Sequence, residues 1–129
     1  DQTLSNFKEQ TMGLDMTAYA IDPTADPKQE PKNLAEWRKH PNLHGWMTKL
    51  WVEKTGNKDD DFNCQELELT EADLDRLFEA VVLNRLPDTT GFFYGSDADD
   101  FYKQNDKFFV QDAKKALADG MRVFYNSWW

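Results

Sequence analysis

The chain has 129 residues and a net charge of −9, from 24 acidic and 15 basic side chains. This length fits a single domain, and an aromatic content of 14% argues against disorder. The acidity argues against binding to nucleic-acid phosphates or to anionic membranes. No apolar run is long enough to span a bilayer, no secretory signal opens the chain, and the one cysteine cannot form an internal disulfide, so we expect a cytoplasmic protein.

The first predicted element is a strand that follows a short leading segment. Residues 1–11 carry few apolar side chains and no period. From Met12 to Ile21 apolar and polar residues alternate, which predicts a half-buried strand. Three prolines in residues 22–33 predict an extended loop. Asn33 is a candidate cap for a helical turn over residues 34–39.

The clearest amphipathic helix in the chain is predicted to begin at Pro41 and to end at Gly56. Proline is favoured in a first helical turn, and glycine commonly follows the last one. Residues 57–63, which come next, are polar and acidic and predict a loop. The apolar positions of the helix recur at spacings of three and four, at Leu43, Trp46, Met47, Leu50 and Trp51.

The second half of the chain begins with a short predicted strand and a capped helix. Alternation over residues 64–69 fits a strand. Thr70 and Asp73 have the spacing of a capping box, and the helix that they start is expected to stop before Pro87. The apolar segment at residues 91–95, bounded by glycines, predicts a short strand or a buried turn.

A third helix and a closing strand complete the predicted order. The helix is expected to be capped by Ser96 or Asp97 and to stop at Gly120, and residues 121–129 alternate as a strand. Burial of the two terminal tryptophans stays open. The helix residues expected to share its buried face are Phe101, Phe108, Ala113, Ala116 and Leu117.

These elements predict an α+β fold in a single domain over residues 12–129. Helices alternate with short strands, but the strands lack the continuous apolar runs that are typical of a parallel sheet. We therefore expect a small, mostly antiparallel sheet with about three helices packed on one of its faces.

Two histidines have the spacing of a helical zinc pair, but their sequence context argues against it. His40 and His44 are four residues apart. Pro41 interrupts the helix that would align them and stands where a metalloprotease motif has its glutamate. We therefore expect a solvent-facing His40 and a His44 that forms a hydrogen bond at the helix start.

The remaining polar patterns do not complete a metal or catalytic motif. Asp59, Asp61 and Asn63 match the first ligand positions of a calcium loop, but Cys64 and Thr70 stand where that loop needs glycine and glutamate. Cys64 has no CxxC partner, and a dyad with a distant histidine has no supporting motif. We expect no metal, no cofactor and no catalytic residue.

Two segments are candidates for a ligand site. The first places a tryptophan beside two cations in an acidic protein, with a histidine a few residues further on. The second encloses aromatic residues between two glycines that permit close backbone approach. Its glycines do not form either of the usual nucleotide-binding loops. The candidate ligand-binding residues are Trp37, Arg38, Lys39, His44, Gly91, Tyr94, Gly95 and Ser96.

Six short segments occur in an order that resembles a known group of proteins. They are Met-Gly-Leu-Asp-Met (12–16), Trp-Arg-Lys (37–39), Leu-His-Gly-Trp (43–46), Leu-Pro (86–87), Gly-Phe-Phe-Tyr-Gly-Ser (91–96) and Tyr-Asn-Ser-Trp (125–128). This order resembles small proteins encoded by bacteriophages and by prophage-bearing or environmental bacteria. Those proteins typically begin MGLDMYL and carry YWRK, IHxWF and GFFFGS motifs.

The resemblance implies a cytoplasmic location in a bacterial host and a family start at Met12, so that residues 1–11 lie upstream of it. Thr17 and Glu36 depart from the pattern, since they stand where the group carries tyrosine and another aromatic residue. The resemblance brings no established activity. Some members are labelled phosphoglycerate kinase, but this chain is much shorter than that enzyme and has no nucleotide-binding loop.

Three functions follow as hypotheses. The leading one is a non-enzymatic module that binds a host protein or a second copy of itself, because tryptophan and arginine often anchor interfaces. The alternative is a small-molecule binder or enzyme for a phosphate- or carboxylate-bearing ligand, held by the Trp-Arg-Lys and Gly-Phe-Phe-Tyr-Gly-Ser segments. The third is an acidic decoy of nucleic acid, which requires carboxylates spaced like phosphates along one face.

Overall fold

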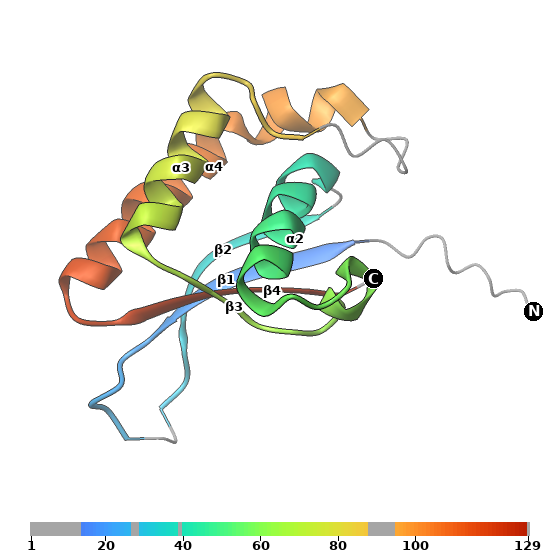
Figure 1. Ribbon diagram of the computed structural model, residues 1–129. Coiled ribbons are helices and arrows are strands. Elements are labelled where there is room, and N and C mark those ends of the chain that lie inside the picture. Colours follow the sequence, from blue (N-terminus) through green and yellow to red (C-terminus); the bar gives the residue numbers. More distant parts are fainter. Residues whose placement is uncertain (1–13, 27–28, 39, 88–94, 129) are drawn as a thin grey trace, which may run out of the picture.

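A computed structural model describes residues 14–26, 29–38, 40–87 and 95–128 (Figure 1). The elements in chain order are β1 (Asp15–Ile21), β2 (Lys32–Arg38), α2 (Pro41–Thr55), the short 3-10 helix η2 (Asp59–Phe62), β3 (Leu67–Leu69), α3 (Glu71–Val82), α4 (Gly95–Ala118) and β4 (Arg122–Trp128).

The four strands form one antiparallel sheet in the order β2-β1-β4-β3. The closing strand β4 therefore lies between the first strand and β3. Figure 1 shows the three α-helices on one side of this sheet. This arrangement confirms the predicted α+β class, the antiparallel sheet and the helices on one face.

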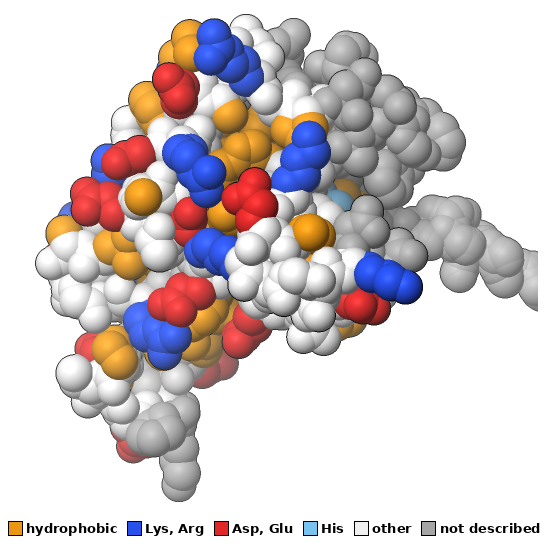
Figure 2. All heavy atoms as spheres, in the orientation of Figure 1, with side chains coloured by type: hydrophobic (Ala, Val, Ile, Leu, Met, Phe, Trp, Pro, Cys, Tyr) orange, Lys and Arg blue, Asp and Glu red, His pale blue; other side chains and the backbone are white. Residues whose placement is uncertain are grey.

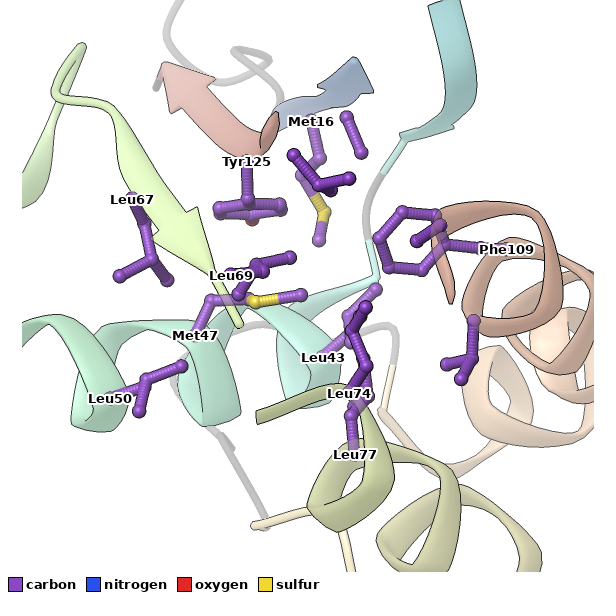
Figure 3. Packing of buried hydrophobic residues seen from close by; sticks show 14 of the residues in the cluster. Met16, Leu43, Met47, Leu50, Leu67, Leu69, Leu74, Leu77, Phe109 and Tyr125 are labelled. Carbon is purple, nitrogen blue, oxygen red and sulfur yellow. The ribbon is translucent and has the colours of Figure 1, made fainter. Parts of the chain in front are cut away.

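The hydrophobic core fills the space between the sheet and the helices. Residues of β1 alternate between buried and half-buried, as the sequence predicts, with Met16, Ala18 and Ala20 facing inward. Figure 3 shows side chains of the sheet and of all three helices converging there. The opposite side of the sheet, called the outer face below, carries the other set of side chains, which begins with Asp15, Thr17 and Tyr19 on β1.

The helix ends follow the local chemistry of the sequence. The helix α2 has proline in its first turn and ends at Gly56, whose left-handed conformation (φ 74°) suits glycine. The Thr70 side chain accepts a hydrogen bond from the backbone N–H of Asp73, and the Asp73 carboxylate accepts one from the backbone N–H of Thr70. The predicted capping box at the start of α3 is therefore confirmed.

The prediction of a helical turn over residues 34–39 was wrong, because residues 34–38 belong to the strand β2; residue 39 lies outside the described ranges. Residues 32–38 pair with β1, from Lys32 opposite Ala20 to Arg38 opposite Asp15. A register shift after Ala18 leaves Leu34 out of the one-to-one pairing. Pairing along β1 outweighs the local helix signal, because it satisfies backbone groups and buries Trp37.

Two expectations for α4 were also wrong. Ser96 and Asp97 lie inside the helix, which the structure describes from Gly95, so neither is its cap. Phe108 is 54% exposed instead of buried, because the buried face is formed by positions such as Phe109 and Ala113. Residues 91–94, where a strand or turn was predicted, lie outside the described ranges.

Candidate functional site

The two neighbouring residues Trp37 and Arg38 point to opposite faces of the sheet. Side chains alternate along a strand, so only one of them can face the helices. Trp37 is buried in the core, whereas the Arg38 side chain is 77% exposed on the outer face. Trp37 and Arg38 therefore do not share a single ligand-binding surface.

A buried polar network holds Trp37 in place. The indole Nε1–H of Trp37 donates a 2.7 Å hydrogen bond to Oδ1 of Asp106 on α4. His40 Nε2 donates a 2.8 Å hydrogen bond to the other carboxylate oxygen of Asp106. The His40 ring stacks on Tyr102, with ring centroids 4.8 Å apart. The network links β2, the start of α2 and the middle of α4.

The expectation of a solvent-facing His40 was wrong. Its side chain is 0% exposed and that of Asp106 is 1% exposed. A histidine hydrogen-bonded to a carboxylate is also found in catalytic triads. No substrate reaches this pair in the described structure, because the protein core encloses both side chains. The pair joins elements of the fold.

His44 lies in the core on the helix side of the sheet. Its Nδ1 atom is 3.0 Å from the Tyr125 hydroxyl of β4, and its ring stacks on Phe62 with centroids 5.6 Å apart. Burial lowers the pKa of His44 to about 4 and raises that of Tyr125 above its usual range. The sheet lies between His44 and the Arg38 side chain, so these two candidate ligand residues do not meet.

The outer face carries a row of three exposed or half-buried side chains from three strands. Asp15 of β1 pairs in register with Arg38 of β2 on one side and with Trp128 of β4 on the other. Arg38 Nε lies 3.2 Å from Asp15 Oδ1, and Trp128 is 46% exposed. Trp128 is therefore exposed and not buried, which answers the question that the sequence left open. Trp129 lies outside the described residues.

A shallow hollow of about 450 Å³ opens beside this row. Thr17 and Glu36, which are paired in the next register position on this face, also line it, as do Met16 and Trp37. The hollow brings an aromatic ring and two carboxylates together. Sequence reasoning identified Arg38 but missed Asp15, Glu36 and Trp128, because only the strand register brings them together.

The other half of the outer face is closed by its own side chains. The Tyr19 and Phe124 rings stack with centroids 5.7 Å apart, and the Arg122 guanidinium lies 5.2 Å from the Phe124 ring centroid. Arg122 also donates two hydrogen bonds to the Glu68 carboxylate and thereby holds the pKa of Glu68 below its usual range. These mutual contacts leave the hollow near Trp128 as the more open part of the face.

Both edges of the sheet are partly capped by side chains. On β2, the Tyr102 hydroxyl accepts a hydrogen bond from the Arg38 N–H and donates one to the Arg38 carbonyl. On β3, the ammonium of Lys54 donates a 2.7 Å hydrogen bond to the Glu68 carbonyl. An uncapped edge strand pairs readily with other chains. Because these side chains occupy backbone groups of both edge strands, a partner chain is less able to add a strand at these two positions. Contact with a partner through the outer face is therefore favoured.

The second candidate segment is placed only in part. Gly95 and Ser96 lie in the first described turn of α4. Lys39, Gly91 and Tyr94 lie outside the described residues. The structure brings the end of β2 and the body of α4 together at Arg38 and Tyr102, but it describes no pocket shared by the two candidate segments.

Among the described residues, the remaining reactive groups do not form a second site. Cys64 is exposed, and its backbone N–H donates to the Ser127 carbonyl. Within the described ranges, no three His, Cys, Asp or Glu side chains are grouped so as to hold a metal ion. In the same ranges, no helix has both the length and the apolar character needed to cross a bilayer.

Acidic and basic side chains are mixed on the surface seen in Figure 2. Lys and Arg lie between Asp and Glu across this view of the molecule (Figure 2). Ion pairs such as Lys114 with Asp75 also join opposite charges in the described structure. A mimic of nucleic acid requires an uninterrupted row of carboxylates. The described part of this surface does not present one.

No protein-family model, no curated protein sequence and no solved structure matches this chain. The candidate site is therefore defined by the geometry of the outer face alone.

Proposed function

We propose that this protein is a non-catalytic binding module, of phage or prophage origin, that holds a protein partner against the outer face of its sheet inside a bacterial cell. The observation that carries the proposal is the cross-strand row of Arg38, Asp15 and Trp128. Tryptophan and arginine are enriched among the residues that dominate binding energy at interfaces. None of the elements that the structure describes covers this row.

The net charge favours a different protein as partner over a second copy of the same chain. Each copy carries a charge of −9, so self-association brings two strongly negative molecules together. A partner with a basic surface is instead attracted at long range. Acidity also lowers the affinity of Arg38 for phosphate or carboxylate ligands, which argues against the alternative of an anion-binding site.

A non-catalytic role is supported by where the titratable residues lie. His40, His44 and Asp106 are buried in the core, and their described contacts are with other core residues. The accessible groups at the outer face are an aromatic ring, an arginine and carboxylates. These groups suit recognition, because they offer apolar contact area and charge complementarity.

Selection from a random dodecapeptide library tests this function. Immobilised wild-type protein is expected to enrich peptides that lose binding to Trp128→Ala but keep binding to Phe108→Ala. Phe108 is the matched control, since it is also an exposed aromatic residue but lies on α4. Enriched peptides that bind both variants equally would overturn the outer face as the binding surface, as would the absence of any enrichment.

A further inference from the structure

The carboxylate of Glu36 lies at the hollow without a cationic partner among the described residues. It accepts a 2.7 Å hydrogen bond from Nδ2 of Asn33, which is neutral. The neighbouring carboxylate of Asp15 is already paired with Arg38. Of the two acidic side chains that line the hollow, only Glu36 therefore carries a negative charge that no described Lys or Arg balances.

The Trp128 ring stands on the other side of the hollow. Glu36 belongs to β2 and Trp128 to β4, and β1 lies between these strands. Strands two positions apart in a sheet are separated by about 10 Å. Glu36 is in register with Thr17 and Trp128 with Asp15, so the two side chains are also offset by two residues along β1. This separation leaves room above Thr17 for one flat or compact group, with the carboxylate on one side and the indole on the other.

We infer that the hollow is a binding site for the arginine side chain of a basic protein segment. A guanidinium there stacks on the Trp128 ring, which attracts cations through its π-electrons. It also donates charge-assisted hydrogen bonds to the Glu36 carboxylate. The net charge of −9 on the whole chain attracts a basic partner toward the protein. The inference rests on the proposed function and names the chemistry of its partner.

Arg38 limits how the incoming cation is placed. Its guanidinium is held on the Asp15 side by their ion pair, at 3.2 Å. A second cation at that position would be repelled, so the incoming arginine lies toward Thr17 and Glu36. Because a guanidinium is planar and has several donors, it can contact the indole face and the carboxylate together.

Fluorescence anisotropy with a labelled hexa-arginine peptide at low salt tests the site. We expect Trp128→Ala to weaken the affinity roughly tenfold and Glu36→Gln to weaken it roughly fivefold. The matched controls are Phe108→Ala for the aromatic ring and Asp112→Asn for the charge, both at exposed positions on α4. Each control is expected to change the affinity by less than about twofold.

Equal losses for Glu36→Gln and Asp112→Asn would overturn the inference, because they would show attraction to the overall charge and not to the hollow. An affinity unchanged by Trp128→Ala, or no measurable binding of the peptide, would overturn it as well. The peptide selection separates this failure from that of the proposed function. Selected peptides that depend on Trp128 but lack arginine would retain the binding module and reject the arginine site.

Discussion

The indole N–H of Trp37 and the carboxylate of Asp106 form a buried hydrogen bond of 2.7 Å across 69 residues of sequence. This bond joins an edge strand to the longest helix and is enclosed on all described sides by the core. It makes the position of β2 depend on α4. The same strand carries Arg38 and Glu36 on its other face, so the buried bond also fixes the wall of the hollow.

Replacing Trp37 with Phe tests the contribution of this bond. The ring packing on Phe109 is largely kept, but one Asp106 oxygen loses its donor. We expect the free energy of unfolding in urea to fall by roughly 1–3 kcal/mol. The half-buried Trp46 offers a matched control. Trp46→Phe is expected to cost less than half as much, and equal losses would assign the effect to ring size alone.

The sequence predicted the elements whose signals are local. The alternation of Met16, Ala18 and Ala20, the stripe of α2 and the cap at Thr70 all depend on neighbours within a few residues. The same reasoning gave wrong predictions for two polar residues. Asn33 suggested a helix cap in what is a strand, and His40 was expected at the surface, because neither pairing with β1 nor the distant Asp106 leaves a local signal.

The candidate site was predictable only in part for the same reason. Arg38 was identified from its neighbours in sequence. The residues that share the outer face with it come from positions 15, 36 and 128, and the antiparallel register alone aligns them. A period of two indicates that residues share a face, but it does not indicate which strands are adjacent. The strand order β2-β1-β4-β3 was therefore the missing information.

The Thr70 capping box provides a second prediction about stability. Thr70→Ala removes the side-chain oxygen that accepts from the Asp73 N–H, so one backbone donor at the start of α3 loses its partner. We expect the free energy of unfolding to fall by about 1 kcal/mol. Thermal and urea unfolding measure this change. Thr70→Ser keeps the hydroxyl and is expected to retain most of the stability, and a serine variant as unstable as the alanine variant would contradict the capping role.

The buried His44 predicts how stability depends on pH. Its pKa is about 4 in the folded protein, against an ordinary value of 6.5 for an exposed histidine. Between these values the unfolded chain binds a proton that the folded protein does not, so stability falls as the pH decreases from 6.5 toward 4. The full difference corresponds to about 3 kcal/mol. Urea unfolding measured at several values from about pH 7.5 to about pH 4.5 follows the loss of stability.

The variant His44→Gln isolates this contribution. Glutamine does not titrate, so the variant is expected to show a flatter decline of stability over the same interval, even if its stability at neutral pH is lower. Carboxylates with lowered pKa values, such as Glu68 and Asp73, lose their contribution from about pH 5 downward, but they do so in wild type and variant alike, so the difference between the two slopes reports His44. An identical slope in wild type and variant would show that His44 is not the source.

The capped edge of β2 gives the last prediction. In Tyr102→Phe the ring remains to stack on His40, but the hydroxyl that bonds both the N–H and the carbonyl of Arg38 is lost. One net hydrogen bond is worth about 1 kcal/mol, which corresponds to roughly fivefold in an opening equilibrium. Amide hydrogen exchange at Arg38 is therefore expected to be roughly fivefold faster in the variant.

The amide of Ala18, in the interior strand β1, is the internal reference and is expected to change far less. Equal acceleration at both amides would indicate global destabilisation, whereas an unchanged Arg38 amide would show that Tyr102 does not protect this edge.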